Sequence, residues 1–590
     1  MMKTTLRTVA LVPLIAGLSA TAQRYATEVF TDAQITISPD ITFGQNVDFY
    51  RSDLSNPAIF VPEMQGLQAL VTAGDPIPAP YFDPLDASTA IKVANVQMDV
   101  YEPSQAADCE QNRALFIFVH TGNALPPPVN GSPNGTRKDS SAVEVCKRMA
   151  RRGYVAISMS YRLGWNPIGA TLEIRRGTLL NAIYRAIHDV KQCIRTVKSE
   201  ADVWNIDPSK IILYGEGTGG YISVATATLD NAAEELYIEK FLPDPFNPAV
   251  SYVDSTTVGN IEGFGGLFCM YRPNGQSSDF NFCVNAGGAL ADTSWMDQGD
   301  VPMVAFHTVF DPFAPFTEGT VIVPTTGEQV VPVQGSNLFI QLANTFGNNA
   351  AFANFPDGDP YTDRARSLYG TVATHLGGSV AINTGVEGLY PLVTTDWPGL
   401  GLAPFEEASP WQWWDPASPL ANIDLDGSGP GTTTTGQASQ ASNPNFGPEK
   451  GRAIIDTIIG YMNPRIIVAL SLSDELIAEG DPCDDGDANT VNDSYQAGCD
   501  CVGAPIGIAE VDLYNGLSVQ PNPAHDMLRV VSEKETIIGY ELYDATGRRA
   551  RTATVNARQF IMDRSGLQAG AYFLTVRFAD GSVTRKVALD

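Results

Sequence analysis

The residues best suited to chemistry lie in a glycine-rich turn. Residues 211–221 read IILYGEGTGGY, which is an apolar strand-like run, a turn rich in glycine, and then the start of a helix. A tight turn from strand to helix displays the side chain at its centre, so it is a suitable place for an attacking oxygen. The central residue here is Gly217, which has no side chain, and the nearest aliphatic hydroxyl belongs to Thr218.

A hydroxyl nucleophile also needs a base and an acid to orient that base. Asp311 follows the apolar run at residues 301–306 and carries a carboxylate. Only two histidines come after it, His375 and His525, and residues 395–448 contain none. We expect the earlier His120 and His307, which end strand-like runs, to serve packing or loop bonding.

The elements that must position these residues alternate along residues 91–475. Short apolar runs at 114–119, 154–158 and 211–214 are typical of buried parallel strands. Between them, residues 177–200 carry apolar residues three and four apart, which predicts a helix with one core-facing stripe. Further strands are predicted at 280–284, 301–306 and 389–393, and helices at 141–151 and 448–461. The pattern indicates an α/β fold, a mostly parallel sheet with helices on both faces.

In this order the motifs resemble those of secreted carboxylesterases of the α/β-hydrolase fold. The resemblance rests on the turn around Gly217, on Tyr161-Arg162, and on Asp189 and Arg195 in the long helix. It implies that His120, Thr121 and Gly122 stand for the oxyanion loop together with Thr218, and that Asp311 stands for the acid.

The resemblance fails at the chemistry. The family turn reads G-x-S-x-G, and the serine position is Gly217 here. The family histidine comes from the loop after the last strand, where this chain has none. Thr218 as a displaced nucleophile and His375 as an unrecognised base are the remaining candidates for a working site.

The N-terminus has the features of a secretory signal peptide. Lys3 and Arg7 precede an apolar run at residues 9–18 and then Ala20-Thr21-Ala22, which predicts cleavage after Ala22. We predict no transmembrane segment. In an exported chain the eight cysteines can form disulfides, and Cys269 with Cys283, which flank a turn-rich segment, is the predicted pair.

The remaining divisions are a Pro- and Asp-rich N-terminal arm at 23–90, an Asp- and Cys-rich linker at 476–508, and a small all-β sandwich at 509–590. Within the linker, Asp485, Asp487 and Asn489 place oxygen ligands two residues apart, and the segment resembles calcium-binding repeats of extracellular proteins. No cofactor is required by this interpretation; structural Ca²⁺ is the predicted ion, and the alternative is a merely solvated acidic linker.

The last residues resemble the type A sorting domain of type IX secretion. The motifs are LSVQPNP at 517–523, YDATGR at 543–548 and LQAGAYF at 567–573. The resemblance implies passage through the periplasm, release or attachment at the cell surface, and the secretion machinery as a partner.

Composition narrows the function further. A net charge of −29 in 590 residues argues against binding to a nucleic-acid backbone. The main hypothesis is a carboxylesterase-like hydrolase with a degenerate triad that binds a small ester-like, glycan or hydrophobic ligand with little or no turnover. The alternatives are an active ester hydrolase that uses Thr218 or His375, and a structural or adhesive surface protein whose cleft is filled by an insertion at 316–384.

Overall fold

The computed structural model describes residues 23–244, 246–247, 249–323, 326–375, 378–393, 406–425, 433–473, 475–477, 479–505 and 516–590. The predicted signal peptide at 1–22 lies outside the described residues. The chain divides into two compact units, residues 1–479 with 497–499, and residues 480–496 with 500–590.

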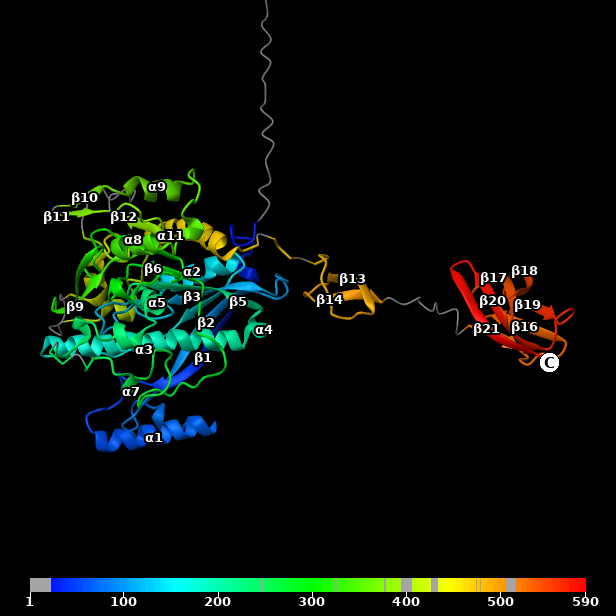
Figure 1. The fold of residues 1–590 in the computed structure, drawn as a ribbon, viewed down its shortest axis with the longest axis horizontal. Coiled ribbons are helices and arrows are strands. Elements are labelled where there is room, and N and C mark those ends of the chain that lie inside the picture. The colour runs from blue at the N-terminus through cyan, green and yellow to red at the C-terminus, as the bar shows by residue number, and fades with distance from the viewer. Residues whose placement is uncertain are drawn as a thin grey trace, which may run out of the picture. The chain divides into compact units, whose positions relative to one another are not determined.

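The first unit is built on an eight-stranded sheet in the order β1-β2-β4-β3-β5-β6-β7-β12 (Figure 1). The pairs β1–β2 and β2–β4 are antiparallel, and every later pair is parallel. The strands are β1 (Ile35–Val47), β2 (Val93–Pro103), β3 (Arg113–Val119), β4 (Val155–Met159), β5 (Ile206–Glu216), β6 (Phe282–Ala286), β7 (Met303–Thr308) and β12 (Leu389–Leu392).

Helices cover both faces of this sheet, as the apolar runs predict. Leu115 and Ile117 of β3 pack in one core with α3 (Leu172–Ser199), α5 (Thr218–Thr228) and α8 (Ser336–Phe346). Phe116 and Phe118 point to the opposite face and pack with α2 (Ser140–Arg151) and α11 (Pro448–Leu470). Alternate residues of one strand thus feed two cores, which is why the central strands are apolar throughout.

Helix α11 is long and apolar enough to cross a membrane by length and composition alone. Half of its most apolar window is buried, and Ile454, Ile458 and Met462 belong to the second core. It is a core helix of the first unit.

The N-terminal residues are more regular than the predicted irregular arm. Residues 35–47 form edge strand β1, and residues 57–73 form α1 (Pro57–Ala73). Helix α1 begins after Asn56, whose side chain accepts a hydrogen bond from Ala58 N, and ends at Gly74 in the left-handed conformation. The prediction of an irregular arm was wrong because only three of the 13 residues of β1 are buried, so the strand has little apolar pattern.

The region at 316–384 holds a two-stranded sheet of β8 (Glu318–Ile322) and β9 (Gln329–Gln334), then α8, α9 (Pro360–Leu368), and a hairpin of β10 (Val372–His375) and β11 (Gly378–Ala381). The remaining helices of the first unit are α4 (Ala201–Trp204), α6 (Ala232–Glu235), α7 (Ser255–Val258) and α10 (Thr435–Ser442).

The second unit starts with a hairpin of β13 (Thr490–Tyr495) and β14 (Cys501–Pro505). Two further antiparallel sheets, β15-β16-β19 and β18-β17-β20-β21, enclose one apolar core, as predicted for a small sandwich. Their strands are β15 (Leu517–Gln520), β16 (Met527–Ser532), β17 (Ile537–Asp544), β18 (Arg549–Ala557), β19 (Gln559–Asp563), β20 (Gly570–Phe578) and β21 (Gly581–Leu589).

The predicted disulfide between Cys269 and Cys283 is wrong, since both are free, buried thiols. Asn46 on β1 lies beside Cys269, whereas Cys283 lies on β6, and five strand spacings of roughly 4.8 Å each separate those strands. The disulfides are Cys109–Cys499, within the first unit, and Cys483–Cys501, within the second.

A buried ion pair fastens the loop after β4 to α3. The Asp189 carboxylate accepts hydrogen bonds from Arg162 N at 2.7 Å, from Arg162 Nε at 2.8 Å and from Tyr271 OH at 2.6 Å. The Arg162 and Asp189 side chains are 1% and 0% exposed.

Asp189→Ala is expected to destabilise the first unit by about 3–5 kcal/mol, because it leaves the Arg162 cation buried without its partner. Asp32→Ala is the control, since its ion pair with Arg151 is at the surface and should cost under about 1 kcal/mol. All seven tryptophans precede residue 476, so their fluorescence in urea follows this unit alone. Equal losses for the two variants would show that the buried pair does not hold this fold together.

Candidate functional site

The turn at Gly217 has the backbone of a reaction centre but no reacting side chain. Gly217 connects β5 to α5 with φ 53° and ψ −116°, a conformation that side chains rarely adopt. Its N–H donates to Ala286 O on β6 at 2.8 Å, and its carbonyl accepts from Gly220 N at 2.9 Å. Glycine takes this conformation with little strain, so the turn persists without a serine.

Close backbone contacts surround the turn. A Cβ atom on Gly215, Gly219 or Gly220 would lie less than 3.0 Å from Gly219 O, Val119 O or Asn285 Oδ1, respectively, closer than real Cβ atoms come to any neighbour. The first turn of α5 therefore lies directly against β3, β5 and β6, and these three glycines are required by packing.

The space beside Gly217 belongs to a different residue. A Cβ atom on Gly217 would also lie well under 3.0 Å from Thr121 Oγ1. Thr121 stands in the loop after β3, at the second position of the predicted oxyanion loop. Its hydroxyl fills the volume that a nucleophile side chain would need, so Gly217 and Thr121 are sterically complementary.

Thr218 fastens the neighbouring loop. Its Oγ1 accepts a hydrogen bond from Asn123 N at 2.7 Å, and the residue is 9% exposed. The loop residues His120, Thr121 and Gly122 thus lie beside the turn, as the predicted oxyanion loop requires. As a nucleophile, Thr218 stays an untested prediction.

His120 is held by its own loop. Its Nδ1 lies 2.6 Å from Thr121 O, and its ring stacks on Tyr161 with centroids 4.5 Å apart. Burial lowers the pKa of His120 to about 4, so the ring is neutral near pH 7. His307 is equally enclosed, between Ser336 Oγ at 2.8 Å and Ala314 O at 2.9 Å.

Asp311 lies after β7, where the acid was predicted. Its Oδ1 accepts from Phe313 N at 2.8 Å and from Ala314 N at 2.9 Å. Burial raises the pKa of Asp311 to about 7, with a further contribution from the charge of Glu407. The side chain lines the same cavity as Gly217 and Thr218.

His375 lies in a different pocket from the turn. It ends β10, and its ring packs edge-on against Phe310 with centroids 4.2 Å apart. That pocket is lined by His375, Asp311 and Glu406, whereas the residues lining the cavity at Gly217 do not include His375. Asp311 borders both pockets, so the pocket of His375 adjoins the cavity at Gly217.

The loop after β12 contributes packing where the family histidine would lie. Trp411, Trp413 and Trp414 are all buried, and Trp414 stacks on Phe446 with centroids 3.9 Å apart. Of this loop, Ala408 and Ser409 line the cavity at Gly217.

The cavity at Gly217 holds about 170 Å³ and is mainly apolar. Its polar end consists of Thr121, Asn123, Thr218, Tyr221, Asp311 and Ser409. Its body comes from α3 and α5 (Leu179, Leu180, Ile183, Ile187, Ala225), from Trp165, Leu229, Leu236, Phe241 and Trp295, and from β8 and β9 (Val321, Ile322, Val331, Val333). Strands β8 and β9 lie in the predicted insertion at 316–384, but no sequence pattern indicated that their valines and Ile322 line the cavity.

Family models match two parts of the chain. One, described as BD-FAE, matches residues 98–262, and another, described as a secretion system C-terminal sorting domain, matches residues 518–590. The first match includes the turn at Gly217, the oxyanion loop and the Arg162–Asp189 pair. Residues 98–262 belong to an esterase-like α/β-hydrolase domain. The sorting domain directs the protein through type IX secretion to the cell surface or beyond.

Solved structures of an esterase from Thermogutta terrifontis are similar to part of the hydrolase domain. Esterase 2 phosphorylated by paraoxon is 20% identical, with 38% of this chain and 69% of that chain covered and a TM-score of 0.25. The apo form is 19% identical over 38% and 70%, with a TM-score of 0.24. No curated protein matches the chain.

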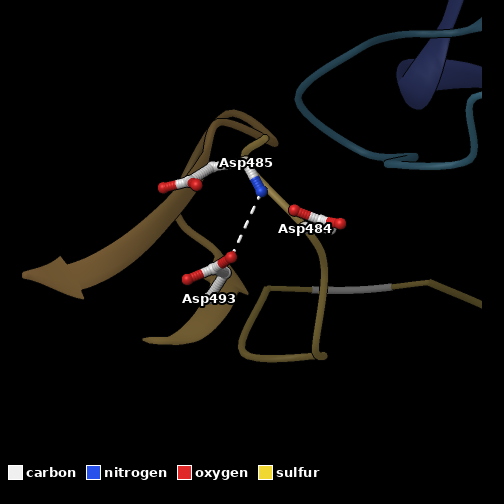
Figure 2. Close-up of side chains that lie close together, drawn as sticks. All are labelled: Asp484, Asp485 and Asp493. Carbon is white, nitrogen blue, oxygen red and sulfur yellow. Dashed lines mark hydrogen bonds between the residues drawn. The ribbon is translucent and has the colours of Figure 1, made fainter. Parts of the chain in front are cut away.

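The second unit contains a carboxylate cluster that only partly matches the predicted calcium ligands. Oxygens of Asp484, Asp485 and Asp493 lie within 4.8 Å of one another, and Asp485 N donates to Asp493 Oδ2 at 3.3 Å (Figure 2). Asp487 Oδ1 instead accepts from Asn489 N at 2.9 Å within the turn. Asp485 is shared by both sets, and calcium binding stays a prediction.

If calcium binds this cluster, 1 mM Ca²⁺ should raise the unfolding midpoint of the second unit by several degrees relative to EDTA, because the ion neutralises gathered carboxylates. Calorimetry of the mature chain measures this. Asp493→Asn should abolish the difference in midpoint if the observed cluster binds the ion. Asp487→Asn should abolish it only if the predicted ligand set binds the ion. Equal unfolding midpoints in Ca²⁺ and in EDTA would contradict calcium binding and favour the alternative, a solvated acidic segment.

Buried acids near the turn predict a pH-dependent stability. Burial raises the pKa of Glu216 to about 7, opposed by hydrogen bonds from Gln412 and Ser141, and burial raises the pKa of Asp139 to about 7. Each of these two carboxyl groups therefore holds its proton to a higher pH in the folded domain than in the unfolded chain, so the contribution of each to stability falls as pH rises from about 4 to 7.

Glu216→Gln should flatten this slope and stabilise the hydrolase domain at pH 8 by about 1–3 kcal/mol, while changing little at pH 4. Urea unfolding followed by tryptophan fluorescence at a series of pH values measures the effect. Asp32→Asn, at a largely exposed side chain, is the matched control. If the stability of Glu216→Gln runs parallel to that of the wild type between pH 4 and 8, the assignment to Glu216 is contradicted.

Proposed function

We propose that the hydrolase domain is a ligand-binding protein of the esterase type with little or no turnover, carried to the cell surface by its sorting domain. The observation that carries the proposal is the turn itself. Gly217 occupies the nucleophile position, and the Thr121 hydroxyl fills the space in which a nucleophile would stand.

The expected loss of activity is large. Removing serine and histidine from a working triad costs on the order of 10⁶ in rate, and a residual enhancement comes from binding and the oxyanion hole. This chain lacks both residues at the family positions. The loop at 120–122 lies beside the turn, and Asp311 lines the same cavity, which supports a site that accepts a ligand.

The alternative of an active hydrolase has less support. Thr218 Oγ1 is engaged by Asn123 N, so its lone pairs already help to hold the loop. His375 lies against Phe310 in the adjoining pocket. An active site would need the base within hydrogen-bond reach of its nucleophile.

The alternative of a purely structural or adhesive protein predicts a filled cleft. The region at 316–384 lines the cavity through β8 and β9, and about 170 Å³ of space is left beside Gly217. A cavity with an apolar body and a few polar groups at one end suits a small hydrophobic or ester-like ligand better than a glycan, whose hydroxyls would need many polar partners.

The deciding experiment is an ester-hydrolysis assay with the mature chain, residues 23–590, and p-nitrophenyl butyrate. We expect a rate at least 10⁴-fold below the 1–10³ per second typical of enzymes. Thr218→Val and His375→Ala should leave this background unchanged, because neither residue forms a catalytic pair.

Turnover at an ordinary enzymatic rate would overturn the proposal. Loss of that turnover in Thr218→Val or His375→Ala would then establish the displaced nucleophile or the unrecognised base. Gly217→Ser combined with Thr121→Gly restores a serine with room for its side chain, and it should still be slow because no histidine follows β12.

A further inference from the structure

We propose that Thr121 is the ligand-positioning residue of the cavity, and that its hydroxyl donates a hydrogen bond to a carbonyl-type oxygen of the ligand beside Gly217. This inference rests on the proposed function and names the group that holds the ligand. It starts from the position of Thr121 Oγ1, which lies where the side chain of residue 217 would project.

Of the hydroxyls that line the cavity, the Thr121 hydroxyl lies nearest to where a side chain at position 217 would project. The Thr218 hydroxyl accepts from Asn123 N, and Asp311 Oδ1 accepts from two backbone N–H groups. The Tyr221 hydroxyl is buried and has no hydrogen-bond partner among the described residues, and Ser409, which is partly exposed, lines the cavity as well. Thr121 is partly exposed and lines the cavity, and no hydrogen bond to its Oγ1 is present within the described part of the chain.

The backbone of Thr121 is held firmly enough to position a ligand. Its carbonyl lies 2.6 Å from His120 Nδ1 and accepts a hydrogen bond from Tyr161 OH at 3.3 Å. These two buried rings stack on each other, so they fix the loop from behind. A donor on a fixed backbone loses little entropy when it binds, which favours a specific hydrogen bond.

The rest of the cavity limits the size and polarity of the ligand. Its volume of about 170 Å³ is close to that of an apolar protein cavity, roughly 150 Å³, that holds one benzene ring. The described residues that line the cavity include no lysine, arginine or histidine that could pair with an anion. They do include the acidic residue Asp311. An uncharged molecule with one ring-sized apolar body and one oxygen acceptor therefore fits better than a free carboxylate.

The test compares two uncharged probes of nearly equal shape, acetophenone and isopropylbenzene, which differ in having or lacking the carbonyl. Dissociation constants for the mature chain are measured by calorimetry. Thr121→Val, which replaces the hydroxyl by a methyl group, should weaken acetophenone binding about 3- to 10-fold and change isopropylbenzene binding by less than twofold.

Two further variants separate positioning from packing. Thr121→Ser keeps the donor and should keep most of the preference for the ketone. Tyr221→Phe removes a buried, unpartnered hydroxyl from the same lining and should leave most of the preference for the ketone. Loss of that preference in Tyr221→Phe but not in Thr121→Val would overturn the inference.

The inference is overturned if Thr121→Val weakens both probes equally, if it leaves acetophenone binding unchanged, or if neither probe binds the wild-type chain. Failure of the proposed function would be seen in a different experiment, as ester turnover by the wild-type chain. Turnover together with an intact ketone preference would make Thr121 a positioning residue of an active enzyme.

Discussion

The hydrolase domain depends on how closely the first turn of α5 approaches the sheet. Glycines at 215, 219 and 220 let the helix backbone touch β3, β5 and β6 where any Cβ atom would collide. That contact fixes the turn at Gly217, directs the start of α5 toward the cavity, and lets Thr218 reach the loop after β3. The buried Arg162–Asp189 pair joins the loop after β4 to α3, which forms much of the cavity wall. The architecture of the site thus comes from packing and does not require that the site react.

The contacts that hold the turn do not depend on a side chain at position 217. The turn uses its glycines for contact, and the serine position alone can change without disturbing them. Replacement of a side chain by Gly217 relieves backbone strain, and the neighbouring Thr121 hydroxyl fills the space that becomes available. His120 and Asp311 stay bonded to their own loops, so their positions do not depend on a catalytic partner.

Much of the fold could be predicted from the sequence, because the central strands are buried on both faces and read as unbroken apolar runs. The long helix shows its stripe, although it begins earlier, at Leu172. Edge strand β1 has an exposed, weakly patterned sequence, so it was missed. Cys269 and Cys283 were predicted to pair because they are close in sequence. In the sheet they lie far apart, since Cys269 is beside β1 and Cys283 is on β6. The turn and the acid position were visible as motifs, whereas the meeting of Thr121 with Gly217 joins residues far apart in the chain and follows only from the parallel pairing of β3 with β5. The separate pocket of His375 likewise follows from the path of the hairpin β10–β11.

The two disulfides determine what any proteolytic maturation would leave behind. Cys109–Cys499 ties the end of the acidic segment to the loop between β2 and β3, and Cys483–Cys501 closes the hairpin β13–β14. A cut after Cys501 and before β15 would separate the sorting sandwich and keep the carboxylate cluster on the hydrolase domain. A cut before Cys483, at residues 475–479, would release nothing, because the pieces would stay joined through Cys499. Cleavage on the C-terminal side of the hairpin therefore frees the sandwich. Cleavage on its N-terminal side yields a nicked molecule whose two pieces stay joined by a disulfide.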